Sequence, residues 1–192
     1  MIEAELKARV RSPEAITRRL DERAMARVEV YQDTYYDRPD GSLEKADREL
    51  RVRTVHGAEG TRTVLTFKDA PIDEDSRSKP EHETRVEDEA AAHAILRGLG
   101  YVEHIALEKH CRNYAFEARG RQMLATLVRV PEIDGTFVEV ETLVEADEVS
   151  AAVEDIHHVL VELGVGLADL TRETYTGAVA ALRGSLGAIR PQ

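Results

Sequence analysis

The alternation of apolar and charged residues at the start of this chain constrains its fold more than any other feature. Ile2, Ala4 and Leu6 fall on one side, whereas Glu3 and Glu5 fall on the other, and the alternation continues to residue 11. A period of two residues is that of a β-strand with one buried face. Similar alternating or aromatic-rich segments follow, giving about eight strands in all. They span residues 2–11, 31–37, 49–55, 62–68, 81–86, 107–116, 123–130 and 136–143.

Helices are predicted between and after these strands. Ser12 and Pro13 resemble an N-cap followed by proline at the first helical position, which predicts a helix to about residue 23. Asp88 caps a second one, and apolar residues three and four apart between 149 and 163 predict a third. A last helix is expected over residues 167–182. The fold class is therefore α+β, with an antiparallel sheet wide enough to curl or close.

The 192 residues suit one domain. We expect it to span residues 1–183 and the tail, 184–192, to be flexible. The net charge of −11 argues against a nucleic acid or an anionic membrane as the main partner, but not against a small anion in a local basic site. No apolar run approaches the ~18 residues that span a bilayer, and no secretory signal is visible, so a cytoplasmic location is expected.

The polar faces of the predicted strands carry charges of both signs. On one strand, a solvated face explains such a pattern. Across six strands of a closed sheet, these faces would line a lumen, where unpaired charges cost roughly several kcal/mol each unless an ion is held. Arginine and lysine suit phosphate oxygens, and clustered carboxylates suit Mg²⁺ or Mn²⁺. The pattern therefore predicts a site for a metal–polyphosphate complex.

The segment from Glu3 to Lys7, Glu-Ala-Glu-Leu-Lys, resembles the E-x-E-x-K signature of the CYTH family, the triphosphate tunnel proteins. This family includes class IV adenylyl cyclases, thiamine triphosphatases and inorganic tripolyphosphatases. The resemblance extends over residues 1–180, and its later part, from Glu139 to Thr142 and through a long helix to Tyr175, is most similar to the class IV cyclases. Between these ends it is carried by Arg51-Val52-Arg53, Lys68, the strand 81–85 and Glu108-Lys109.

The resemblance implies a closed eight-stranded antiparallel β-barrel with flanking helices and a C-terminal helical segment. It implies a small-molecule triphosphate as the ligand, either ATP, thiamine triphosphate or tripolyphosphate, and it leaves a homodimer open. It implies Mg²⁺ or Mn²⁺ held by Glu3, Glu5, Glu139 and Glu141. The implied triphosphate ligands are Lys7, Arg9, Arg51, Arg53, Lys68, Arg85, Lys109 and Arg172, with Lys7, Arg53 and Lys109 as the catalytic residues.

Two positions depart from the family pattern. The family usually has an inward aspartate on the strand before Glu139, but residues 124–130 contain no acid, and Glu132 and Asp134 follow only in the next turn. A basic residue is common in the family where Cys111 stands here. Both departures weaken the site, and they put cyclase activity most in doubt.

Three hypotheses follow. The first is a metal-dependent enzyme that converts ATP to cyclic AMP and pyrophosphate or hydrolyses a triphosphate. The second is a catalytically weak or inactive module that binds nucleotide or polyphosphate. The third is a structural domain whose charged faces are solvated.

Smaller features leave alternatives open. Tyr31, Tyr35 and Tyr36 could stack on a base or belong to the core. His157 and His158 could bind metal, although adjacent residues on a helix point in different directions. Residues 69–80, which have no hydrophobic period, are predicted to form a long loop of the kind that covers binding sites.

Overall fold

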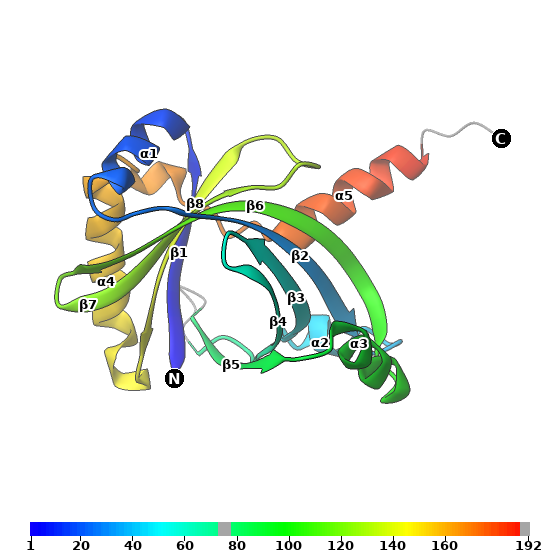
Figure 1. The fold of residues 1–192 in the computed structure, drawn as a ribbon. Helices are drawn as coiled ribbons and strands as arrows, with labels where there is room; N and C mark the ends of the chain where they lie inside the picture. The colour runs from blue at the N-terminus through cyan, green and yellow to red at the C-terminus, as the bar shows by residue number, and fades with distance from the viewer. Residues whose placement is uncertain (73–77, 189–192) are drawn as a thin grey trace.

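A computed structural model describes residues 1–72 and 78–188. In this part of the chain eight antiparallel strands close into a barrel in the order β1-β5-β4-β3-β2-β6-β7-β8, as Figure 1 shows. The predicted closed barrel is therefore confirmed. The strands are β1 (Ile2–Val10), β2 (Arg27–Asp37), β3 (Glu49–Gly57), β4 (Gly60–Lys68), β5 (Lys79–Val86), β6 (Val102–Ala118), β7 (Arg121–Arg129) and β8 (Thr136–Val144).

Helices cover the outside and one end of the barrel (Figure 1). They are α1 (Pro13–Asp21), α2 (Ser42–Lys45), α3 (Glu89–Gly98), α4 (Val149–Glu162) and α5 (Tyr175–Ala188). The short helix α2 was not predicted from sequence. The carboxylate of Asp37 accepts hydrogen bonds from the backbone N–H groups of Leu43 and Glu44 at its start, and this capping residue lies outside the helix.

The end of the chain differs from its prediction. The last helix begins at Tyr175 rather than near residue 167, because residues 167–169 form a separate 3₁₀ turn. It then continues through Ala188, so residues 184–188 of the predicted flexible tail are helical. Residues 189–192 lie outside the described part, as do residues 73–77 of the predicted loop 69–80.

Strand β1 is held very differently along its two edges. It pairs with β8 over its whole length, from Ile2 opposite Val144 to Val10 opposite Thr136. On the other edge, only its first two residues pair with β5. Farther along that strand, Ala8 forms a bridge with Leu170, and Thr171 N–H donates to the carbonyl of Lys7. The segment before α5 therefore flanks the part of β1 that β5 does not reach.

The larger core lies outside the barrel wall, between the strands and helices α1 and α4. Ala4 and Ala8 of β1 are fully buried in it and pack in one cluster with Ile156 and Leu160 of α4. Because side chains alternate along a strand, this packing turns Glu3, Glu5 and Lys7 toward the barrel interior. The outer apolar face of β1 thus fixes the orientation of the charged inner face.

No helix in residues 1–72 and 78–188 is both long enough and apolar enough to cross a membrane.

The helix α4 core gives a direct stability test. Replacing fully buried Ile156 with alanine should lower the free energy of unfolding by about 2–5 kcal/mol, through lost burial and the cavity left behind. The matched control is Val161→Ala on the same helix, whose side chain is 52% exposed and should cost under ~0.5 kcal/mol. Urea unfolding measures both, and equal losses would contradict the assigned packing.

Candidate active site

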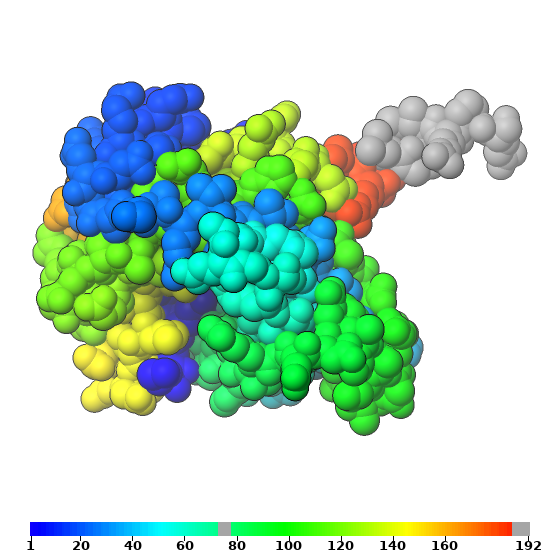
Figure 2. All heavy atoms as spheres, in the orientation of Figure 1, coloured from blue at the N-terminus to red at the C-terminus, as the bar shows by residue number. Residues whose placement is uncertain are grey.

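The barrel encloses an open cavity of about 1180 Å³, lined mainly by polar and charged residues. The side chains come from every strand and from the segment before α5. In Figure 2 the dark blue amino terminus lies between the yellow connection from β8 to α4 and the green β5 region. Charged residues of the lining are Glu3, Glu5, Lys7, Asp47, Glu49, Arg51, Arg53, Lys68, Lys79, Glu81, Glu83, Lys109, Glu139, Glu141 and Arg172.

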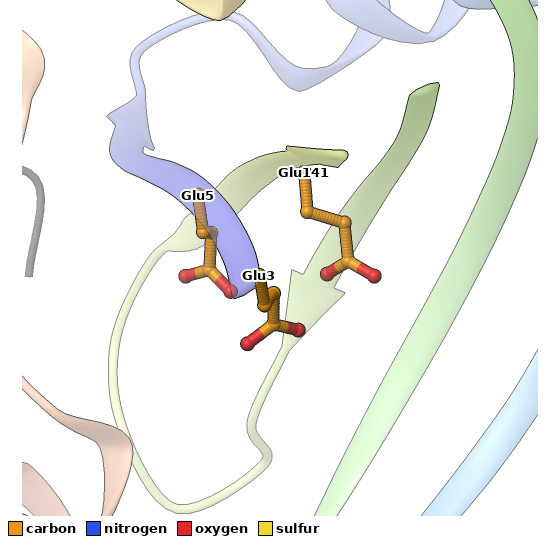
Figure 3. A group of neighbouring side chains, drawn as sticks. All are labelled: Glu3, Glu5 and Glu141. Carbon is orange, nitrogen blue, oxygen red and sulfur yellow. The ribbon is translucent and has the colours of Figure 1, made fainter. Parts of the chain in front are cut away.

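Three carboxylates converge on one side of this cavity (Figure 3). Glu3 and Glu5 lie on β1, and Glu141 lies opposite Glu5 on β8. One oxygen from each falls within 4.8 Å of the others. Burial, followed by the charges of Glu139 and Glu3, raises the pKa of Glu5 to about 8, and burial also raises the pKa of Glu141. These groups are crowded enough that each additional negative charge is unfavourable.

Glu3 differs from its two neighbours because it has a cationic partner. Lys68 of β4 donates to its carboxylate and also lies 3.7 Å from Glu81 of β5. Although burial acts in the opposite direction, the charge of Lys68 keeps the pKa of Glu3 below its usual value. Lys68 therefore neutralises part of the charge of the carboxylate cluster.

Arg51 of β3 is a buried cation with few compensating contacts, one of which is the Tyr35 ring, whose centroid lies 6.0 Å from its Cζ. It is 8% exposed and forms no ion pair within the described ranges. Its Nη2 donates to Thr66 at 3.4 Å, whereas its buried Nε has no hydrogen-bond partner in the described structure. Such a group is expensive to bury unless another acceptor is supplied. The geometry therefore leaves a donor available for an anion.

Arg53 and Lys109 share a buried partner, Asp33 of β2. Arg53 donates to its carboxylate through Nε at 2.6 Å and Nη2 at 2.8 Å. Lys109 Nζ lies 3.4 Å from the same carboxylate. Despite burial, these cations hold the pKa of Asp33 well below its usual value.

Tyr175, the first residue of α5, lines the cavity next to Lys7 and Lys109. Its ring centroid lies 4.5 Å from Lys7 Nζ and 4.6 Å from Lys109 Nζ. Lys7 also donates to the backbone carbonyl of Glu173. Behind the ring, Phe137 and Val179 belong to a buried apolar cluster. The interior is therefore charged along only part of its length, since α5 fills one end with apolar side chains.

The CYTH domain family model matches residues 1–175 of this chain. The chain belongs to the CYTH family. It is 24% identical over 178 residues to a protein of Methanocaldococcus jannaschii named "Putative adenylate cyclase", covering 91% of this chain and 97% of that one.

Solved structures share the fold of this chain. A Pyrococcus horikoshii protein is 30% identical and superimposes with a TM-score of 0.80, covering 93% of this chain and 98% of its own. A Hippeastrum protein described as a "Putative adenylyl cyclase" with "a dominant triphosphatase activity" is 17% identical, with a TM-score of 0.66. The alignment covers 94% of this chain and 96% of that protein, and at this identity the likeness concerns the fold alone.

Most of the residues expected from the CYTH resemblance meet in the cavity, but three positions differ. Arg9 is exposed and donates to the carbonyl of Asp134 at 3.3 Å. Arg85 is exposed on β5, and neither arginine lines the cavity. Glu139 lines it but stands outside the three-carboxylate cluster. The period of two residues predicts which side chains of a strand point inward. It does not predict how far along the barrel axis each side chain lies, and therefore whether it reaches the cavity.

The inner face of β7 carries no acid. Leu124 and Thr126 stand opposite Glu141 and Glu139 at the positions where a carboxylate would face the cluster. Of the two acids in the following turn, Glu132 is bound to Arg183 at 2.8 Å, and neither it nor Asp134 lines the cavity.

The cysteine, the three tyrosines and the two adjacent histidines differ in whether they line the cavity. Cys111 lines the cavity, but burial raises the pKa of its thiol to about 12, which disfavours a reactive thiolate. Tyr31 and Tyr35 line the cavity, whereas Tyr36 lies in a separate core. His157 and His158 lie on α4, and neither is part of a metal-ligating group in the described residues.

Sequence reasoning missed Asp33, and it also missed the lining residues Asp47, Glu49 and Lys79. A signal for Asp33 was present, because Asp33 shares strand parity with Tyr31 and Tyr35, but a single acid among aromatic residues does not reveal which cations it meets.

The carboxylate cluster gives the folded protein a defined pH dependence. Because the pKa of Glu5 is raised from 4.5 to about 8, the folded state keeps a proton that the unfolded state has lost between these values. The free energy of unfolding should therefore fall as pH rises from 4.5 to 8, by up to ~1.4 kcal/mol per pH unit. Glu5→Gln should flatten this slope, measured by urea unfolding with a chelator present. Glu154→Gln, exposed on α4, should retain the wild-type slope, and an unchanged slope in Glu5→Gln would contradict the assignment.

Proposed function

We propose that the cavity binds an organic triphosphate together with Mg²⁺ or Mn²⁺ and hydrolyses it. The observation that carries this proposal is Arg51, a buried guanidinium with no ion pair in the described residues and an unused Nε donor. The positive charge of Arg51 also helps to lower the pKa of Glu3. The cavity thus holds a cation with an unused donor and a cluster of carboxylates whose charge is only partly neutralised. In a metal–triphosphate complex, the phosphate oxygens would supply the acceptor and the metal ion would supply the positive charge.

The basic side would bind the phosphate chain. Arg51 and Arg53 of β3 present planar guanidinium groups, which suit bidentate contacts with phosphate oxygens. Lys109 and Lys7 add point charges, and each Nζ lies within 4.6 Å of the Tyr175 ring centroid. These groups come from strands β1, β3 and β6 of the closed barrel, so they would contact the phosphate chain from several directions.

The acidic side fits a divalent cation. Glu3, Glu5 and Glu141 offer three carboxylate oxygens within 4.8 Å of one another. Burial, and then repulsion from neighbouring carboxylates, raises the pKa of Glu5 and Glu141, and a cation would offset both effects. When bound there, Mg²⁺ or Mn²⁺ would offset the charge that develops on the phosphate oxygens. Oxygen ligands of this kind suit hard cations of this size.

Hydrolysis is favoured over cyclisation by β7. Cyclisation requires the ribose 3′-hydroxyl to attack a closely positioned α-phosphorus with pyrophosphate leaving, whereas hydrolysis requires water to attack the terminal phosphorus. Leu124 and Thr126 supply no carboxylate to steady the complex. The dominant triphosphatase activity described for the Hippeastrum protein supports the same direction. Tyr31 and Tyr35 offer aromatic faces for the organic part of the substrate.

The second candidate is a binding module without turnover, which the same lack of an acid on β7 favours. It predicts stabilisation by a triphosphate without any product. At ligand 100-fold above Kd, this stabilisation would be ~2.7 kcal/mol.

A product assay with ATP, thiamine triphosphate and tripolyphosphate tests the proposal. Each is offered with Mg²⁺ and with Mn²⁺, and phosphate, pyrophosphate and cyclic AMP are measured separately. We expect phosphate from an organic triphosphate. Arg51→Gln should lower kcat/KM about 10–100-fold, because a charge-assisted contact is lost. Arg48→Gln is the matched control, since Arg48 pairs with Asp69 outside the cavity lining.

The outcomes separate the hypotheses. Formation of cyclic AMP and pyrophosphate would show that the reaction is cyclisation and would contradict the proposed hydrolysis. Stabilisation by a triphosphate without product would select the binding module. Equal activity in Arg51→Gln and Arg48→Gln would contradict the assigned phosphate site.

A further inference from the structure

Asp33 has an environment that a simple structural ion pair does not explain. Its side chain is fully buried and does not line the cavity, yet it contacts two cations that do. The charge of Arg51 also acts on it. A single carboxylate therefore stands behind three of the cations to which we assign the phosphate chain.

The contacts fix the direction of Arg53. Asp33 engages Nε and Nη2 along one edge of the guanidinium, while the Tyr31 ring centroid lies 4.4 Å from Cζ. With one edge and one face held, the N–H groups of Nη1 remain for another acceptor. Arg53 thus has a single orientation before any ligand arrives, which lowers the ordering cost of binding.

The same carboxylate limits the positive charge of the wall. Lys109 and Arg53 together carry two positive charges, and Asp33 cancels one of them at 3.4 Å or less. In a low-dielectric barrel, such a charge also weakens the attraction felt by a phosphate on the cavity side. This weakening applies to a phosphate product as well as to a polyphosphate substrate, so it would speed product release.

We propose that Asp33 is a positioning residue that orients Arg53 and Lys109 for catalysis and moderates the affinity of the site for polyphosphate. This inference rests on the proposed function. A structural role alone predicts that its loss lowers stability and weakens binding and turnover together. A positioning role that also moderates charge predicts that binding and turnover change in opposite directions.

Two variants separate charge from position. Asp33→Asn keeps the size of the side chain but removes its charge, so Kd for inorganic tripolyphosphate, measured by calorimetry with a chelator, should fall about tenfold. Its kcat for the best substrate should fall at least about tenfold, because Arg53 is no longer held. Asp33→Glu keeps the charge but displaces the guanidinium, so Kd should stay near the wild-type value while kcat falls.

Asp155→Asn is the matched control, since Asp155 pairs with Arg121 at 2.9 Å outside the barrel and should change neither quantity. Weaker or unchanged tripolyphosphate binding in Asp33→Asn, with a normal wild-type titration, would overturn the role of Asp33 alone. If Asp33→Asn does not fold, the same decision rests on Asp33→Glu, where parallel losses in binding and kcat would overturn the inference. A wild-type protein that binds no tripolyphosphate and turns over no triphosphate would overturn the proposed function and this inference with it.

Discussion

The arrangement of the site depends on the packing of β1 against α4. Ala4 and Ala8 are fully buried against that helix, and the pleat of the strand then leaves Glu3, Glu5 and Lys7 no direction except inward. A shift of one residue in register would bury these charges under α4 and expose the alanines to the cavity. The apolar core outside the wall therefore determines the chemistry inside it.

Electrostatic balance explains the internal layout. The carboxylate cluster lies on β1 and β8, while Arg51 and Arg53 lie on β3 across the barrel. Several cations of the cavity are compensated by carboxylates of the protein. Glu3 pairs with Lys68, Glu49 with Lys79, and Asp33 with Arg53 and Lys109. Within the described ranges Arg51 forms no direct ion pair and its Nε has no hydrogen-bond partner, and Glu5 and Glu141 form no ion pair either. The site is thus divided between groups that are neutralised by the protein and groups left for a ligand.

The strands and the carboxylate pair on β1 could be predicted because a period of two residues identifies both an element and its inner face. Arg9 and Arg85 show the limit of that signal, since they share parity with cavity residues but lie beyond its ends. The same limit applies to α5. Its sequence predicts a helix, but tertiary contacts such as the bridge between Ala8 and Leu170 are what bring Tyr175 close to Lys7 and Lys109. Contacts between residues so far apart in the chain leave no local pattern.

A crystal structure with Mn²⁺ and a non-hydrolysable ATP analogue tests the central claim most directly. The account predicts anomalous density for Mn²⁺ among Glu3, Glu5 and Glu141, with phosphate oxygens accepting hydrogen bonds from Arg51 Nε and from Arg53. Phosphates bound on the outer surface, or inside the barrel without contact to Arg51, would contradict it.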